Sequence, residues 1–486
     1  MARLMRRTMS LVAMLALATA VFGSSGRAAA QGQATTAAPG TWESAINLQN
    51  NSDQAASPVV INFYNADGTL IKAYTLAEPI PARGAVSIFV PAFVTDLASG
   101  QYSATVESVQ PLIASVSTGS TNSPTPPWTS FAYEGVNAGE TATSLFFPLL
   151  QKGYFNFFSE MVIQNAGAST ANVTARFVNA TGQTIHTANL GAVAPKASRT
   201  FPINAIQQLP SGDVAGIFGA VVTSTENMPL VGVANIWRTT PTAGTASYNA
   251  FTAGSNTLYA PALLKNYYGF VAALTLQNVH PTETASVTVA YSNGQRETLQ
   301  LAPSAARALL PFNNPQMGSG DPAGLFAARV TTSGGSLVGV VSQSIPTGTS
   351  GAFAAYKAPN TASARVNVPS VVSDYYGYFT AVNVQNAGNA ATNITITYAP
   401  SATCPGITTN SRTFNNVAAG QSVNILHLNN AGDVLPNNCA TSAVVTSSGG
   451  QGLVATMQQN TAANVAGFAA NKQPSDFLSA VTGLPQ

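Results

Sequence analysis

Residues able to perform catalysis are few in this chain, and they share no common spacing. The three histidines, His186, His280 and His427, occupy unmatched positions, whereas a catalytic triad or a zinc site needs partners that converge at one place. The sequence holds no G-x-S-x-G elbow, no glycine-rich dinucleotide fingerprint and no phosphate-binding loop. We therefore expect the histidines to be surface or loop residues. We predict a protein that is not an enzyme and that uses no cofactor and no metal.

Aspartate and glutamate are also thinly spread, with 17 such residues in a chain of 486. A glycosidase needs two carboxylates facing one cleft, and calcium needs a cluster of acidic ligands; the sequence shows neither grouping. Three aspartates nevertheless recur near the turn before a late strand: Asp213, Asp321 and Asp433. Because aspartate side chains bond nearby backbone amides in turns, we expect these three to cap turns.

The only two cysteines, Cys404 and Cys439, both lie in the last quarter of the chain. In an exported protein an even pair is most simply a disulfide, and two free buried thiols are the alternative. We predict the disulfide. It would close a loop of roughly 35 residues and stabilise the fold by about 3–4 kcal/mol in the chain-entropy model.

Three pairs of adjacent aromatic residues are the one place where a binding surface is expected. Tyrosine faces can stack on sugar rings without catalysis, but these pairs also fall where one repeat meets the next. Binding of a ligand and packing between modules therefore both remain open as interpretations. The residues are Tyr154, Phe155, Tyr267, Tyr268, Tyr375 and Tyr376.

The composition excludes several classes of partner. Charged residues make up 7% of the chain and the net charge is +2, so the chain has no field to attract nucleic acid. Hydrophobic residues make up 45%, which is enough to bury a core. The mature part holds no run of about 18 apolar residues, so we predict no transmembrane segment.

An internal repeat is the strongest signal in the sequence. A Gln-Asn pair follows an alternating apolar run four times, and the glutamines Gln49, Gln164, Gln277 and Gln385 are 115, 113 and 108 residues apart. Each pair is followed by a second alternating run, then by turn residues such as Asp67-Gly68 or a Pro- or Gly-containing turn, then by further strands.

Each repeat thus has seven or so short strands in about 110 residues, which is typical of a two-sheet sandwich of immunoglobulin or fibronectin-III type. Propeller blades are shorter, with four strands, so the repeat length argues against a propeller. We predict an all-β fold of four tandem Ig-like antiparallel β-sandwich modules in an elongated array. The predicted segments are a signal peptide at 1–30, repeats at 31–143, 144–256 and 257–363, and a fourth repeat with a C-terminal tail at 364–486.

The signal-peptide prediction rests on the layout of the first 30 residues. Arg3, Arg6 and Arg7 precede an apolar stretch at 11–22, and a run of three alanines ends at Ala30. A short N-terminal membrane anchor is the alternative. We accordingly predict a secreted, extracellular protein.

The first repeat differs from the others at its start. Repeats two to four open with an apolar segment interrupted by proline, which implies an edge strand or a bend, whereas residues 31–40 are rich in Gly, Ala and Thr. One hypothesis is that residues 476–485 of another molecule fill the missing place by strand addition. Residues 35–42 of the same chain are the alternative.

On its repeat length, strand count and export signal, the mature chain resembles bacterial cell-surface proteins built from tandem Ig-like β-sandwich repeats. The resemblance implies a structural or assembly role at the cell surface, as a surface-layer, sheath or fibre subunit, with self-association or other cell-surface proteins as partners. A glycan- or protein-binding adhesin, using loops and the aromatic pairs, is the alternative.

Overall fold

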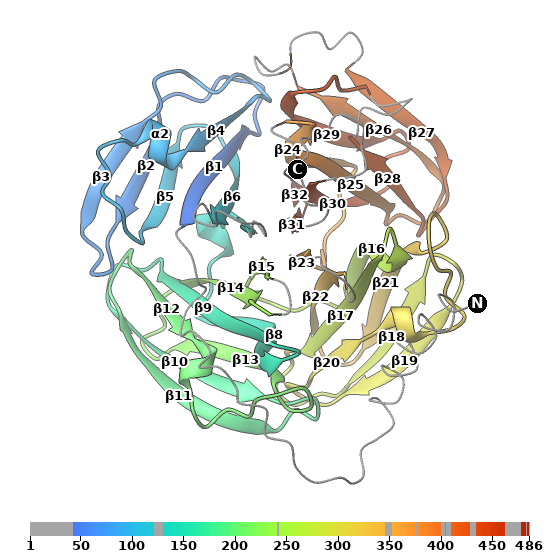
Figure 1. The fold of residues 1–486 in the computed structure, drawn as a ribbon, viewed down its shortest axis with the longest axis horizontal. Helices are drawn as coiled ribbons and strands as arrows, with labels where there is room; N and C mark the ends of the chain where they lie inside the picture. The colour runs from blue at the N-terminus through green and yellow to red at the C-terminus, as the bar shows by residue number, and fades with distance from the viewer. Residues whose placement is uncertain are drawn as a thin grey trace. The chain divides into compact units, whose positions relative to one another are not determined.

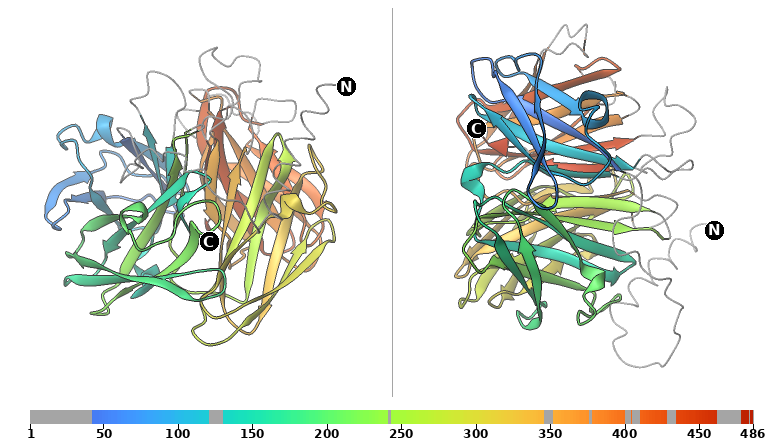
Figure 2. Two further views of the ribbon diagram at one scale, coloured as in Figure 1. Left: turned by 60° about the horizontal axis from the view of Figure 1, so that its bottom comes forward. Right: turned by 90° about the vertical axis from the view of Figure 1, so that its left-hand side faces the viewer.

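The computed structural model describes residues 42–120, 130–240, 243–345, 352–375, 378–399, 404, 410–427, 434–461, 478–482 and 484–485. The predicted signal peptide, Tyr376 and Asp433 lie outside these ranges. Residues Thr36–Gln486 form one compact unit. Its regular structure is almost entirely strand, as the arrows in Figures 1 and 2 show.

Module 1 comprises β1–β7 in two antiparallel sheets, ordered β4-β1-β6-β7 and β3-β2-β5. Alternate side chains of β1 and β2 face the space between these sheets and form its core. The elements are β1 (Trp42–Asn50), β2 (Val59–Tyr64), β3 (Leu70–Thr75), β4 (Ala85–Phe89), α2 (Val90–Phe93), β5 (Ser103–Ser108), β6 (Leu112–Ser120) and β7 (Ser130–Glu134).

Modules 2 and 3 have one additional strand each and share a single topology. In module 2 the order is β11-β10-β13-β8-β9-β14-β15 with β12 on β9, and module 3 repeats it with β16–β23. The strands of module 2 are β8 (Ser144–Tyr154), β9 (Phe157–Asn165), β10 (Ala171–Val178), β11 (Thr184–Val193), β12 (Ser198–Pro202), β13 (Ile217–Ser224), β14 (Leu230–Arg238) and β15 (Gly244–Asn249). Those of module 3 are β16 (Thr257–Tyr267), β17 (Phe270–Asn278), β18 (Ala285–Tyr291), β19 (Arg296–Leu301), β20 (Ala306–Leu309), β21 (Leu325–Ser333), β22 (Leu337–Ser344) and β23 (Phe353–Lys357).

Module 4 has two sheets, ordered β27-β26-β29-β24-β32 and β28-β25-β30-β31. The strands are β24 (Arg365–Ser373), β25 (Tyr378–Asn386), β26 (Thr392–Tyr398), β27 (Ser411–Val417), β28 (Ser422–Leu426), β29 (Cys439–Ser447), β30 (Leu453–Thr461), β31 (Leu478–Thr482) and β32 (Leu484–Pro485). The predicted all-β fold of tandem antiparallel sandwiches is confirmed.

The Gln-Asn repeat marks the end of the same strand in every module, where the asparagine holds the neighbouring loops. The buried Asn165 donates from Nδ2 to the carbonyls of Ser169 (2.8 Å) and Val193 (2.9 Å), and its Oδ1 accepts the amide of Gly167 at 2.8 Å. Each of these bonds satisfies a backbone group that would otherwise lack a partner. The counterparts with the same pattern are Asn50, Asn278 and Asn386.

The proline-containing segments form the first strands of modules 2–4. β8, β16 and β24 pair with β13, β21 and β29, and the register shifts next to Pro148, Pro261 and Pro369. The predicted bend is therefore present. A buried tyrosine closes over it in two modules, because the Tyr248 hydroxyl donates to the Leu149 carbonyl at 2.6 Å and that of Tyr356 to Ala262 at 2.9 Å.

The first strands also contact the next module. β8 contacts β17 and β22, β16 contacts β25 and β30, and β24 contacts β1 and β6 of module 1. Four buried residues of module 3 belong to the core cluster of module 2: Val338, Val340, Phe353 and Ala355. Modules are therefore joined through apolar surface, and module 4 contacts module 1 in addition to its neighbour along the chain.

One expectation is wrong and another is met only in part. The C-terminal segment pairs within its own module, β31 with β30 and β32 with β24, so it belongs to module 4 and is not a spare strand for another molecule. His427 lies in a loop after β28, as expected, but it is fully buried. Its ring nitrogens contact the Thr380 carbonyl at 2.8 Å and the Tyr398 hydroxyl at 2.7 Å, which fits a neutral imidazole that donates to the carbonyl and accepts from the hydroxyl.

Candidate functional site

The aromatic pair of module 2 lies at the tip of the hairpin between β8 and β9. Phe155 and Asn156 adopt positive φ angles of 47° and 62°, which turn the chain within two residues. The rings of Tyr154 and Phe155 meet edge to face with centroids 4.8 Å apart. The side chain of Phe155 is 46% exposed, so an aromatic surface faces solvent here.

Asp213 holds this hairpin tip in place, since its Oδ1 accepts the Phe155 amide at 2.7 Å. The aspartate was expected to cap the turn in which it lies; the structure shows it bonding the amide of a distant hairpin instead. Burial raises the pKa of the Tyr154 hydroxyl, and the charge of Asp213 adds to that effect.

The equivalent aromatic pair of module 3 has the same ring geometry as that of module 2, and both of its residues carry a hydroxyl group. The rings of Tyr267 and Tyr268 are also 4.8 Å apart and edge to face, and Tyr268 is 60% exposed. The Tyr268 hydroxyl donates to Oδ2 of Asp321 at 2.8 Å, which raises the pKa of Tyr268 to about 12. The Tyr267 hydroxyl accepts a hydrogen bond from Asn424 of module 4 at 2.9 Å.

The two interpretations of the pairs therefore apply to different residues. Tyr267 lies at a contact between modules, whereas Phe155 and Tyr268 present rings to solvent beside a carboxylate. In module 4, Tyr375 pairs through its backbone with Tyr378, and Tyr376 lies outside the described residues. An exposed ring next to a hydrogen-bonding carboxylate can stack on a sugar and bond its hydroxyls; ligand binding itself stays a prediction.

Two lysines at the base of these hairpins have structural roles that the sequence did not indicate. Lys152 donates to the carbonyls of Ile206 (2.6 Å) and Leu209 (2.9 Å). Lys265 does the same in module 3, to Asn314 at 2.6 Å and to a second loop carbonyl. Burial lowers the pKa of both lysines. In the sequence, the one feature that could have indicated these roles is that each lysine lies twelve residues before the repeat glutamine, Gln164 or Gln277.

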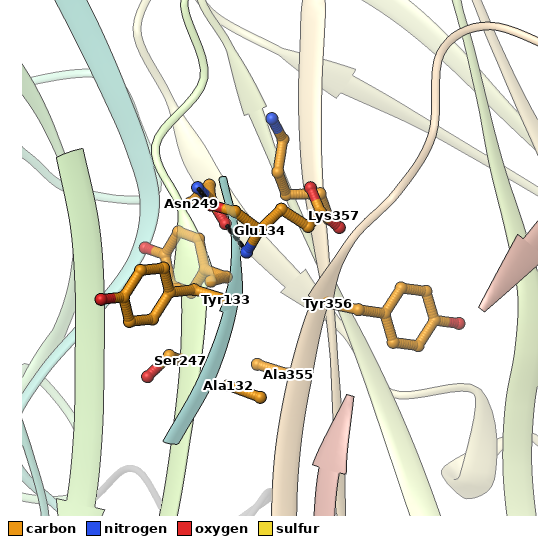
Figure 3. Close-up of a pocket in the computed structure, with 9 residues that line it drawn as sticks. Ala132, Tyr133, Glu134, Ser247, Asn249, Ala355, Tyr356 and Lys357 are labelled. Atoms are coloured by element: carbon orange, nitrogen blue, oxygen red, sulfur yellow. Dashed lines mark hydrogen bonds between the residues drawn. The ribbon is translucent and has the colours of Figure 1, made fainter. Parts of the chain in front are cut away.

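The last strands of modules 1–3 lie side by side and carry equivalent tyrosines (Figure 3). Asn249 of β15 bonds the backbone of Glu134 on β7 twice, through Nδ2 at 2.7 Å and Oδ1 at 2.9 Å. The cavity between the strands measures about 10 Å³, room for about one water. This region is a seam between modules. Its tyrosines are Tyr133, Tyr248 and Tyr356.

A larger cleft of about 260 Å³ opens next to this seam. Its lining includes Glu134, Glu140 and Lys357, and the Lys357 ammonium lies 4.9 Å from the centre of the Phe251 ring. No histidine or cysteine lines it. Throughout the described residues, no group of three or more His, Cys, Asp or Glu side chains could hold a metal ion. No helix in those same ranges is long and apolar enough to cross a membrane.

The predicted disulfide is confirmed between Cys404 and Cys439. Both cysteines are buried in the core of module 4. Disulfides persist in oxidising compartments, so this bond agrees with an extracellular location.

No protein-family model matches the chain, and no curated protein matches it. A solved Thermotoga maritima protein is similar over 23% of this chain and 93% of its own, with 15% identity and a TM-score of 0.19. The RrgB pilus protein of Streptococcus pneumoniae aligns over 97% of this chain and 95% of its own, with 8% identity and a TM-score of 0.12. An α-L-rhamnosidase of Streptomyces avermitilis aligns over 90% of this chain and 54% of its own, with 9% identity and a TM-score of 0.14. At these TM-scores no argument passes from those proteins to this one, and the resemblance to tandem surface proteins stays an expectation.

Proposed function

We propose that the protein is an exported, non-catalytic structural protein of the bacterial cell surface, a subunit of a surface layer, sheath or fibre. The observation that carries this proposal is the continuous core between modules, in which Phe353 of module 3 packs 4.5 Å from the Phe157 ring of module 2. Modules joined in this way behave as one stiff body and not as domains on linkers.

The use of polar side chains supports the same proposal. The buried asparagines at the strand ends, the tyrosine hydroxyls behind the proline bends and His427 all bond to backbone groups or to one another. These groups stabilise loops and seams, and their bonding capacity is used within the fold. Of the three histidines, His427 is thus committed to structure.

Self-association is expected to involve module 1, which presents several exposed apolar side chains. Leu70 and Ile71 of β3 are about half exposed, as are Phe89 and Phe93 near α2. Apolar residues gathered on one module favour contact with another copy. Electron microscopy of the purified exported chain should show ordered polymers. The double substitution L70S/I71S should reduce them, whereas V214S at the exposed Val214 of module 2 should not.

Two observations together would contradict the proposal. The purified protein would remain monomeric at every concentration in electron micrographs, and antibodies against it would label no structure on the cell surface. Polymers that form equally well with L70S/I71S would retain the structural role but move the contact away from β3.

A second candidate function, glycan binding by an adhesin, is favoured by the exposed rings of Phe155 and Tyr268 beside Asp213 and Asp321. On a glycan array the monomeric protein would bind a restricted set of sugars. The double variant F155A/Y268A would lose at least tenfold in affinity, because each stacked ring contributes about 1 kcal/mol or more.

The matched control for that experiment is F89A, which removes an exposed aromatic ring of β4, outside the two hairpin tips. Binding that F155A/Y268A leaves unchanged, or that F89A reduces equally, would rule out the hairpin tips as the glycan site.

A further inference from the structure

Module 1 lacks, among the described residues, the strand that opens every other module. β5 is the counterpart of β13, β21 and β29, since each pairs with the strand that follows the Gln-Asn corner. Those three strands have a first strand on their other side. β5 ends its sheet, which has the order β3-β2-β5. One row of its backbone amides and carbonyls is therefore free for pairing among these residues.

The side chains that a first strand would cover are less buried in module 1 than anywhere else. Val106 of β5 is half-buried and Ala104 is exposed, and Leu112 of β6 is half-buried. Their counterparts in modules 2–4 are all buried. These are Val222, Val330 and Val445; Ala220, Ala328 and Ala443; and Leu230, Leu337 and Leu453.

The surface of β9 and β14 in module 2 is also less covered than its counterparts. The first strand of each module contacts the next module, so the missing strand of module 1 should leave module 2 uncovered. Gln164 and its cross-strand partner Val231 are half-buried. The three equivalent pairs lie on strands that the first strand of another module contacts, and they are buried: Gln49 with Ile113, Gln277 with Val338, and Gln385 with Val454.

The hydroxyl of Tyr133 agrees with this pattern. Its counterparts Tyr248 and Tyr356 donate to the residue after the proline of β8 and β16. The Tyr133 hydroxyl makes no hydrogen bond to another described residue. Burial raises its pKa to about 12, so this hydroxyl stays protonated and able to donate.

From these observations we infer that the position between β5 of module 1 and β9–β14 of module 2 accepts a β-strand from another exported polypeptide. The pairing is antiparallel to β5, as β8 is to β13. The strand brings Leu or Val at one position and an apolar residue two positions later, because that is what occupies the equivalent places in modules 2–4: Leu145 and Phe147, Leu258 and Ala260, Val366 and Val368.

The composition of this chain favours a partner over the chain itself as the source. Residues 31–41 read QGQATTAAPGT and contain no apolar side chain larger than proline. Covering Val106 and Leu112 with a large apolar side chain is worth about 1.5–3 kcal/mol for each such side chain buried, and alanine supplies little of it. The C-terminal strands are already paired in module 4.

The inference deepens the proposed assembly role and rests on it for the class of partner. The test uses the full exported chain and a synthetic peptide with the sequence of β24, RVNVPSVVS. The peptide should bind saturably and should slow hydrogen exchange of those β5 amides within 103–108 that face away from β2. A control peptide with aspartate at the positions of Val366 and Val368 should not bind.

Three variants of the chain make the result specific. Because Ala104 is exposed, A104K should leave the fold intact and weaken peptide binding at least tenfold by blocking the apolar wall. V214K, a matched change at an exposed site of module 2, should bind the peptide normally. Y133F should bind a few-fold more weakly, because it loses one hydrogen bond.

Absence of binding, or binding that A104K does not weaken, would overturn the inference. Slow exchange, in the free chain, of the β5 amides that face away from β2, or binding only after deletion of residues 31–41, would assign the position to the chain's own N-terminal segment and would equally overturn it. If A104K lost peptide binding but still formed polymers like the wild type, strand binding and assembly would be independent of each other. The proposed function would then stand without polymerisation depending on this position.

Discussion

Replacing Asn165 by alanine should reduce the free energy of unfolding by about 3–5 kcal/mol. The substitution removes the hydrogen-bond partner of two carbonyls and one amide in neighbouring loops. Each buried polar group left without a partner costs about 1–3 kcal/mol. Water can reach part of the site and offsets some of that cost. Urea unfolding followed by the fluorescence of Trp237, which is buried in the same module, measures the effect.

Gln164 provides the matched control, because it is the adjacent amide on the same strand. Its Nε2 makes one long bond of 3.3 Å to the Lys196 carbonyl, and the side chain is half-buried. Q164A should therefore cost no more than about 1 kcal/mol. If N165A proved no more destabilising than Q164A, the corner bonds would have no special part in stability.

Removing the disulfide should cost module 4 about 4 kcal/mol. The bond joins residues separated by 35 positions, and the chain-entropy model gives about 4 kcal/mol for a loop of that length. The double variant C404A/C439A should unfold at correspondingly lower urea concentration, observed by the exchange of amides in β25 and β29. The wild type under reducing conditions should behave in the same way.

Modules 1–3 offer the internal comparison, since they contain no cysteine. Their amides should lose less protection from exchange in C404A/C439A than the amides of module 4. If the free energy of unfolding of module 4 fell by less than about 1 kcal/mol, the unfolded chain would already be restricted without the disulfide.

The fold could be predicted from the sequence because its main signals are local. Alternation along β18, whose residues are alternately buried and half-buried, depends only on the period of a strand. The bend at Pro148 follows from the missing amide of proline. The disulfide followed from there being two cysteines in an exported chain.

Features that depend on distant partners could not be predicted. His427 is buried because Tyr398 and Thr380 satisfy both ring nitrogens, and neither is near it in sequence. The Gln-Asn pair was visible as a repeat, but its role needed the loops that Asn165 joins. Tyr267 and Tyr268 are adjacent in the chain, yet one contacts Asn424 of module 4 and the other Asp321 of its own module.

The apolar side chains of module 3 that complete the core of module 2 set the size of the cooperative unit. Cutting the chain after residue 256 would separate Val340 and Phe353 from Phe157 and its neighbours. Each fragment would expose apolar side chains that are buried in the intact chain, and its sheet would be prone to aggregate. Neighbouring repeats should therefore melt together, and the smallest piece that stays soluble when expressed alone should be longer than one repeat.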